Sequence, residues 1–416
     1  MSPAPHEKWP RKRLKYVVSL RRSRVDGGED ERPYLGLENI ESWTGKLVST
    51  PSEDDDAPSS PGMEGTSLSN TFEPEDVLFG KLRPYLAKAW VADFPGRSTT
   101  ELLVMQPVHV DPRYLLYVCL WRDFIDTVDA STFGSKMPRA DWGFIGNMTV
   151  PIPPLAQQRA IADYLDRETA RIDGLIVAKE RVLGLLAEKR RALITRAVTR
   201  GLDRHAPLRE SGIPWLGEIP AHWEVERARW LFRERDVRSE TGEEELLTVS
   251  HLTGVTPRSE KDVNMFKAES NKGYKTCVPG DLVINTLWAW MGAMGVAPVA
   301  GIVSPAYNVY EPGDRLEPAY VDALVRLPIF AQEVTRYSKG VWSSRLRLYP
   351  EGLFQVYFPV PPREEQRAVI EHIAHEAAKL DAVRETTERT VSLLRERRSA
   401  LIAAAVTGQI DAEAAA

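Results

Sequence analysis

Apolar side chains recur at intervals of seven in two distant stretches of the chain. Such spacing is typical of a long helix that buries a narrow seam against another helix. The middle seam position is polar in both stretches, as expected where a seam gives up some stability to fix its register. The seam positions are Leu165, Ile172, Lys179, Leu186 and Leu193 in the first stretch, and Ile373, Leu380, Thr387, Leu394 and Leu401 in the second.

A second stripe runs beside each seam, and prolines and glycines mark the ends of both stretches. A Pro-Pro pair stands before each stretch, while Gly201 and Gly408 lie where a helix would stop. About 44 residues at 1.5 Å each predict helices roughly 65 Å long. The second stripe comprises Ile161, Leu175 and Val182, matched by Val369, Val383 and Thr390.

The two stretches are copies of one segment. A shift of 208 positions lays residues 151–203 over 359–411 without a gap, with 22 identities at 53 positions. Fainter matches precede each copy, because FEPEDVLFGKL from Phe72 resembles CVPGDLVINTL from Cys277. A repeat of this length predicts that each half of the chain is a globular domain followed by a long helix.

We therefore expect an α+β fold with two similar mixed α/β domains, each followed by a long helix. Two helices with the same register can bury their seams against each other as an antiparallel coiled coil with pseudo-two-fold symmetry. The expected parts are a first domain (1–150), a first helical region (151–203), a linker (204–217), a second domain (218–358), a second helical region (359–411) and a tail (412–416).

Composition and charge limit the chemistry of the chain. The net charge of −5 argues against a protein that coats nucleic acid by bulk charge, although residues 8–24 hold eight basic side chains and no acid. Cys119 and Cys277 form no CxxC pair, so we expect buried small side chains rather than a disulfide or zinc site. The chain has neither a long apolar run nor a signal-peptide pattern, and we expect a cytoplasmic location.

Catalytic motifs are missing from the sequence. It contains no GxxxxGK[ST] phosphate loop and no HExxH metal motif. His372 and His375 stand one helical turn apart without a third ligand at suitable spacing, and SPAY at 304–307 lacks the second proline of a methyltransferase tetrad. We predict no metal site, no bound cofactor and no catalytic residues.

The segments PIPPLAQQRAI and PVPPREEQRAV, together with GIPWLGEIPAHWEV before the second domain, carry a family resemblance. Along its whole length the chain resembles the specificity (S) subunit of type I restriction-modification systems. One departure is Ala156-Gln157, where the second copy has Glu364-Glu365.

The resemblance implies a non-catalytic DNA-recognition subunit. Each globular domain would be a target-recognition domain that reads one half of a bipartite double-stranded DNA target. The helices would dock two adenine methyltransferase (M) subunits, and motor-nuclease (R) subunits would join in the full complex. S-adenosylmethionine and ATP would bind those partners. No membrane is involved. A fused restriction-methylation enzyme and a coiled-coil protein-binding scaffold remain as alternatives.

Recognition of DNA should use basic and aromatic side chains in loops, because these contact phosphates and base edges. The segments just before each helix, FGSKMPR and SKGVWSSRLR, and the matching segments KLRPY and TLWAW are the candidates. The candidate DNA-binding residues are Lys81, Arg83, Lys136, Arg139, Trp288, Lys339, Trp342, Arg345 and Arg347.

Overall fold

The computed structural model describes residues 9–26, 30–48, 68–260, 270–340 and 346–410. The chain divides into two compact units. Unit 1 comprises Met1–Arg181 and Glu388–Ala416, and unit 2 comprises Val182–Thr387. The fold is mixed α+β with two long helices, α4 (Leu155–Arg200) and α9 (Arg363–Val406).

Unit 1 is built on two four-stranded sheets. One has the order β2-β9-β6-β7 and the other the order β3-β5-β8-β4, while β1 pairs with β10 just before α4. The strands are β1 (Arg11–Arg13), β2 (Val18–Leu20), β3 (Arg24–Asp26), β4 (Tyr34–Leu35), β5 (Leu68–Phe72), β6 (Val77–Gly80), β7 (Ala89–Val91), β8 (Gly96–Ser98), β9 (Leu102–Pro107) and β10 (Thr149–Pro151). The helical segments are α1 (Pro112–Cys119), α2 (Arg122–Ala130), α3 (Trp142–Ile145), η1 (Leu14–Tyr16), η2 (Leu37–Asn39) and η3 (Pro84–Leu86).

Strand β6 shows how the layers of unit 1 are held. Its four residues are all buried, so both faces of the strand are covered. Val77 and Phe79 pack into the cluster that contains residues of α1 and α2. Leu78 points to the opposite face, as strand geometry requires, and joins the cluster of the second sheet with Leu35 and Phe72. The first sheet therefore lies between α1 and α2 on one side and the second sheet on the other.

Unit 2 repeats this plan. Its main sheet has the order β14-β21-β18-β19, and two-stranded sheets pair β13 with β22, β15 with β16, β17 with β20, and β11 with β12. The strands are β11 (Leu208–Glu210), β12 (Glu218–Pro220), β13 (Glu224–Arg227), β14 (Phe232–Glu234), β15 (Leu247–Ser250), β16 (Gly254–Pro257), β17 (Lys275–Cys277), β18 (Leu282–Asn285), β19 (Met294–Val296), β20 (Gly301–Val303), β21 (Tyr307–Pro312) and β22 (Tyr357–Val360). The helical segments are α5 (Ala228–Leu231), α6 (Pro318–Val325), α7 (Pro328–Arg336), α8 (Pro350–Leu353), η4 (Arg258–Glu260) and η5 (Ala289–Met291).

The faint sequence match before each helix corresponds to equivalent structure. Asp76 stands directly before β6 and Asp281 directly before β18, and both carboxylates are buried. Arg21 pairs with Asp76 at 2.7 Å, and Arg235 pairs with Asp281 at 2.8 Å. Burial raises the pKa of Asp281, while Arg235 acts in the opposite direction. Each unit thus secures its main sheet with the same buried ion pair.

Segment 204–217, where we expected a linker, carries regular structure. Strand β11 lies in it and pairs with β12 just beyond it. Leu216 packs with Ile219 and Trp223 in a small apolar cluster of unit 2. The apolar side chains in GIPWLGEIP account for this hairpin, because they supply a core that a solvated linker lacks.

The glutamine that recurs after each proline pair joins a long helix to its globular domain. Gln158 accepts a hydrogen bond from the backbone N–H of Asp111 (2.7 Å) and donates to the carbonyl of Pro153 (2.8 Å). Gln366 accepts from the backbone N–H of Glu317 (2.8 Å) and donates to two carbonyls. Asp111 is the N-cap of α1 and Glu317 that of α6, so both glutamines join equivalent points.

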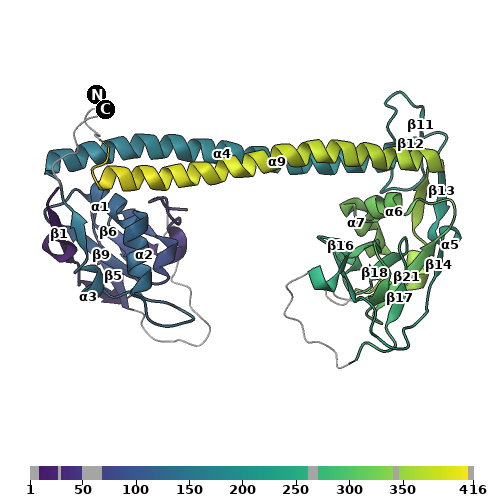
Figure 1. The fold of residues 1–416 in the computed structure, drawn as a ribbon, viewed down its shortest axis with the longest axis horizontal. Coiled ribbons are helices and arrows are strands. Elements are labelled where there is room, and N and C mark those ends of the chain that lie inside the picture. The colour runs from purple at the N-terminus through teal and green to yellow at the C-terminus, as the bar shows by residue number, and fades with distance from the viewer. Residues whose placement is uncertain (1–8, 27–29, 49–67, 261–269, 341–345, 411–416) are drawn as a thin grey trace. The chain divides into compact units, whose positions relative to one another are not determined.

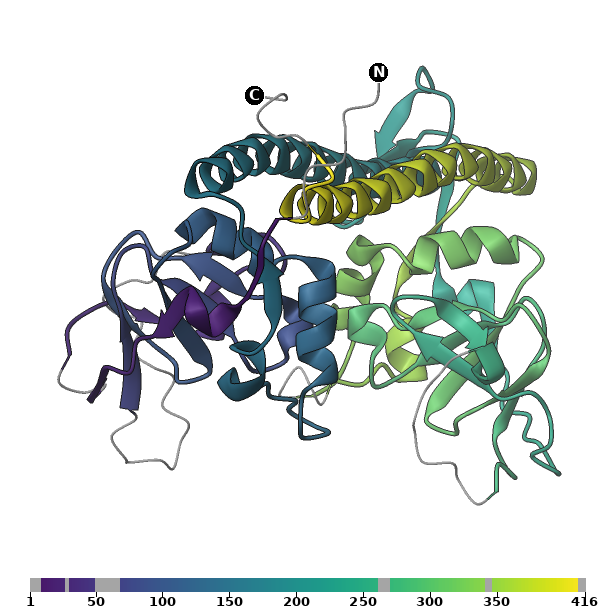
Figure 2. The same ribbon diagram turned by 60° about the vertical axis from the view of Figure 1, so that its left-hand side comes forward.

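The long helices begin and end where the sequence predicts. Each starts directly after its Pro-Pro pair. Gly201 and Gly408 have positive φ angles of 69° and 76°, which glycine adopts without strain just past a helix end. Within unit 1, the first part of α4 and the last part of α9 lie side by side (Figures 1 and 2), and Arg398 on α9 donates to Asp173 on α4 at 2.9 Å.

The seam positions differ in burial along the helices. Leu165 and Ile172 are buried, Thr387 is buried, and Lys179 is half-buried. The remaining seam positions, Leu186, Leu193, Ile373, Leu380, Leu394 and Leu401, are half-buried.

The second stripe is only partly a seam. Ile161 and Val369 are buried, whereas Leu175, Val182 and Val383 are exposed. A straight helix turns by about 20° per heptad relative to a 3.5-residue repeat, which carries such positions away from a narrow contact.

Candidate nucleic-acid interface

Two loops of unit 1 bring together the basic residues expected from sequence. The loop after β6, beginning at Lys81, lies against the hairpin 133–139. The backbone N–H of Arg83 donates to the carbonyl of Pro138 (2.8 Å), and that of Ala140 donates to the carbonyl of Lys81 (2.9 Å). Residues separated by more than 50 positions in sequence therefore form one loop surface. We call residues 81–85 with 133–139 the first loop pair.

The candidates within the first loop pair are not equivalent. Arg83 and Lys136 are exposed, and Lys81 is half-buried. Arg83 adopts a left-handed backbone conformation with φ of 50°, just before η3. That conformation is uncommon for residues other than glycine, and such residues cluster at functional sites. Arg139 differs from the other three, because its guanidinium forms an ion pair with Glu101.

Exposed apolar side chains accompany these cations. Phe133 is 63% exposed, and Tyr85 and Met137 are also among the exposed large side chains. A side chain of this size usually packs inside a protein, so exposure beside basic groups indicates a surface that contacts another molecule. Tyr85 and Phe133 were missed as individual candidates, although the segments KLRPY and FGSKMPR contain them.

Unit 2 has an equivalent arrangement, which we call the second loop pair: residues 286–292 with Lys339 and 346–349. The backbone N–H of Leu348 donates to the carbonyl of Thr286 (3.1 Å). Lys339 and Arg347 exchange two backbone hydrogen bonds of 2.9 Å, and both side chains are exposed. Tyr349 is exposed beside them.

Trp288 occupies the position in unit 2 that Arg83 occupies in unit 1. Each residue directly precedes a short 3-10 helix, η5 or η3. The Trp288 ring stacks on Trp290 with centroids 6.4 Å apart and planes 15° from parallel, yet 49% of Trp288 is exposed. The indole of Trp290 donates to the carbonyl of Leu287 (3.1 Å), which holds the stack in place. The remaining candidates, Trp342 and Arg345, lie outside the described residues.

The two loop pairs combine flat aromatic surfaces with long cations. Lysine and arginine bind phosphates and accepting base edges, while aromatic rings contact thymine methyl groups or stack on bases. Polar loops held by backbone hydrogen bonds to a buried sheet can present these groups in a fixed arrangement. The geometry therefore suits recognition of a nucleic acid better than chemistry on a small molecule.

The residues that the structure describes include neither a group of metal-ligating side chains nor an apolar spanning helix. Among those residues, no three His, Cys, Asp or Glu side chains are grouped as metal ligands. His372 and His375 are both exposed on α9. No helix in the described ranges has the length and apolar character needed to cross a membrane.

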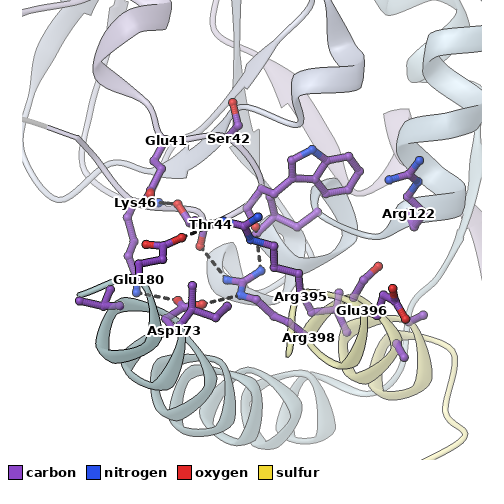
Figure 3. Close-up of a pocket in the computed structure, with 18 residues that line it drawn as sticks. Glu41, Ser42, Thr44, Lys46, Arg122, Asp173, Glu180, Arg395, Glu396 and Arg398 are labelled. Carbon is purple, nitrogen blue, oxygen red and sulfur yellow. Dashed lines mark hydrogen bonds and ion pairs between the residues drawn. The ribbon is translucent and has the colours of Figure 1, made fainter. Parts of the chain in front are cut away.

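Unit 1 also contains a cavity of about 860 Å³ that shares no residue with the first loop pair (Figure 3). It is lined by α4, α9, the segment 41–46, Leu120 and Arg122. Asp173 accepts hydrogen bonds from Lys46 (2.7 Å) and Arg398 (2.9 Å). Arg398 also donates to the carbonyls of Trp43 (2.7 Å) and Thr44 (3.1 Å), and this network fastens the segment to the helices.

No family model matches the chain. Curated relatives include the type I restriction enzyme EcoDI specificity subunit of Escherichia coli, 24% identical over 46% of this chain and 38% of that protein. The MjaVIII specificity subunit of Methanocaldococcus jannaschii is 28% identical over 31% of this chain and 28% of its own length. The EcoBI specificity subunit of Escherichia coli is 19% identical over 82% of this chain and 74% of that protein. The matches thus span well under half of the first two relatives.

Solved structures share the fold. A chain from work on complex assembly and conformational transition of the type I R-M system gives a TM-score of 0.67 at 20% identity, with 98% of this chain and 100% of that chain covered. The HsdS subunit from Thermoanaerobacter tengcongensis gives a TM-score of 0.53 at 19% identity, with 99% and 100% covered. This chain is therefore similar in sequence to specificity subunits of type I restriction enzymes, and it shares the fold of the two solved structures.

Proposed function

We propose that this chain is the non-catalytic DNA-specificity subunit of a type I restriction-modification complex, and that each unit reads one half of a bipartite target. The observation that carries the proposal is the duplicated loop pair. Residues 81–85 with 133–139 and residues 286–292 with 339 and 346–349 occupy equivalent places on equivalent sheets. Two similar recognition surfaces in one chain suit a divided site, as two subunits of a dimeric repressor suit two half-sites.

The contacts between α4 and α9 support an antiparallel pair with pseudo-two-fold symmetry. Arg398 pairs with Asp173 in unit 1, and Arg190 pairs with Asp381 in unit 2. Each residue of one pair lies 208 positions from its counterpart, the offset of the sequence repeat, with the helices exchanged. A two-fold axis relates contacts in this way.

A tyrosine on α1 of unit 1 and a tyrosine on α6 of unit 2 support the same symmetry. The Tyr114 hydroxyl lies 3.0 Å from the carbonyl of Pro151 and 3.4 Å from that of Val406, and Tyr320 donates to the carbonyl of Val198 (2.7 Å). Val198 and Val406 are again repeat partners. Burial raises the pKa of both phenols, so each remains a neutral donor. In our proposal each domain therefore contacts the start of one long helix and the end of the other.

Exposed apolar side chains on the helices support partner docking. Leu175 and Val383 are repeat partners and both are exposed, as are the repeat partners Leu185 and Leu393. Apolar groups that recur at equivalent exposed positions favour two similar contact surfaces. We propose that one methyltransferase subunit binds each surface, and that S-adenosylmethionine and ATP bind to the methyltransferase and motor-nuclease partners.

Methylation assays with the full chain test this function. The purified chain alone should transfer no methyl group from S-adenosylmethionine to DNA, because its sequence lacks the required motifs. With a methyltransferase subunit added, methylated adenines should appear within one bipartite sequence, at about two methyltransferase copies per chain because two docking surfaces are proposed. Methyl transfer by the chain alone, or an identical methylation pattern with the chain omitted, would refute the proposal.

A further inference from the structure

Arg139 is held by a carboxylate along one edge of its guanidinium. Its Nε lies 3.1 Å from both oxygens of Glu101, and its Nη2 lies 3.1 Å from Oε1. The carboxylate therefore occupies the Nε side of the group. A guanidinium has five N–H donors, so Nη1 and the second hydrogen of Nη2 remain for another partner. The Arg139 side chain is 38% exposed, so solvent reaches part of it.

Both members of the pair are fixed by their backbones. Glu101 stands directly before β9, and its carbonyl accepts from the N–H of Lys81 (3.0 Å). Arg139 exchanges two backbone hydrogen bonds of 3.1 Å with Phe133 across the hairpin. The guanidinium is thus held against Glu101, whose backbone is hydrogen-bonded to Lys81 in the other half of the first loop pair.

We propose that Arg139 reads a guanine in the half-site of unit 1 and that Glu101 is the positioning residue that aims it. The proposal rests on the proposed function of the chain. The free end of a guanidinium matches the O6 and N7 acceptors of guanine, which is the commonest specific contact of arginine in the major groove. A contact with phosphate is disfavoured, because the Glu101 carboxylate would repel a phosphate brought to the same guanidinium.

The equivalent position of unit 2 has no counterpart of the Glu101–Arg139 ion pair among the described residues. Thr286 corresponds to Lys81, and its hydroxyl donates to the carbonyl of Ala306 (2.7 Å), which places Ala306 where unit 1 has Glu101. Arg347 corresponds to Arg139 and is exposed, with no ion-pair partner among the described residues. The two units therefore differ at equivalent positions: a carboxylate positions the arginine of unit 1, and we propose no such guanine contact for Arg347 in unit 2.

The test uses the full chain with its methyltransferase partner on a DNA library in which the half-site of unit 1 is randomised. In Glu101→Ala, preference for guanine at one position should fall about tenfold, because a good bidentate contact contributes discrimination of this order. Arg139→Ala should remove that preference, and adding Glu101→Ala to Arg139→Ala should change nothing further. Asp126→Ala, which breaks an exposed ion pair with Arg122 on α2, is the matched control and should leave the preference intact.

Each contrary outcome overturns a specific part of the inference. An unchanged preference in Glu101→Ala would exclude a positioning role, and a uniform loss on all sequences in Arg139→Ala would indicate a phosphate contact instead. A further loss in the double variant would mean that Glu101 contacts a base itself. The unchanged half-site of unit 2 reports that each variant is folded. If the wild-type chain directs no sequence-specific methylation, the proposed function fails first.

Discussion

The side chain of Gln366 accepts a hydrogen bond from the backbone N–H of Glu317 at 2.8 Å, and so joins the first turns of α9 to the N-terminus of α6. Its amide nitrogen donates to the carbonyls of Arg315 (2.9 Å) and Pro361 (2.8 Å). Gln366 is fully buried. One side chain therefore satisfies three backbone groups, and Gln158 has the same role in unit 1 with two such bonds.

Removal of this amide should destabilise the unit that contains it. Gln366→Ala leaves one backbone N–H and two backbone carbonyls without their side-chain partner, and a buried group left unpaired costs about 1–3 kcal/mol. We expect a loss of about 3 kcal/mol in the free energy of unfolding of unit 2, and a somewhat smaller loss in unit 1 for Gln158→Ala. Urea denaturation followed by tryptophan fluorescence measures both.

The neighbouring glutamine provides a matched control. Gln157 is half-buried and forms no hydrogen bond through its side chain among the described residues. Gln157→Ala should shift stability by no more than about 0.5 kcal/mol, as for most surface substitutions. If Gln157→Ala and Gln158→Ala lowered the free energy of unfolding equally, the hydrogen bonds of Gln158 would not be the source of its contribution to stability.

Local patterns in the sequence predict the long helices well. The heptad spacing around Leu165 and Ile172, the proline pairs and Gly201 all act within a few residues, and the helix ends follow from them. The duplication also reveals equivalent segments, because KLRPY and TLWAW form equivalent loops. Sequence reasoning could thus place the candidate loops without knowledge of the sheets.

Features that depend on distant contacts could not be predicted in this way. Glu101 and Arg139 are far apart in sequence, and only the sheet and hairpin bring the carboxylate to the guanidinium. Arg139 therefore looked like one more free cation. The exposure of Leu175 is a related case, since an apolar position in a heptad indicates contact only where a partner surface is present. The hairpin β11–β12 could not be predicted either, because its apolar side chains are buried only when Trp223 packs against them.

Trp288 and Arg83 offer a test of independent reading by the two units. Trp288→Ala removes an exposed ring of the second loop pair, and stacking of a base on such a ring contributes about 1–3 kcal/mol. We expect methylation of the cognate target to fall by about tenfold to a hundredfold, with changed preference only in the half-site of unit 2. Arg83→Ala should change only the half-site of unit 1. The readout is the methylated motif in a host that carries the complex, and a change of both halves by either variant would contradict independent reading.

The spacing between the half-sites should depend on the length of the helices. Adding one heptad after Lys179 and one after Thr387 lengthens both helices by about 10 Å, while the seam positions keep their register. The protein should fold and bind its partner. Along DNA this length is roughly three base pairs, which also turns the second half-site by about 100° around the duplex. Methylation of the original target should therefore be lost. Targets with unchanged half-sites and a longer spacer should be assayed for methylation by the same variant.

A two-residue insertion after Lys179 alone is the matched comparison for that experiment. Two residues rotate the rest of α4 by about 200°, so Leu186 and Leu193 would leave the seam and Arg190 would turn away from Asp381. We expect a lower melting temperature by circular dichroism for this variant, and a nearly unchanged one for the double heptad insertion. Normal melting after the two-residue insertion would show that the seam contributes little to folding. Persistent methylation of the original target by the double heptad variant would show that the helices do not set the spacing.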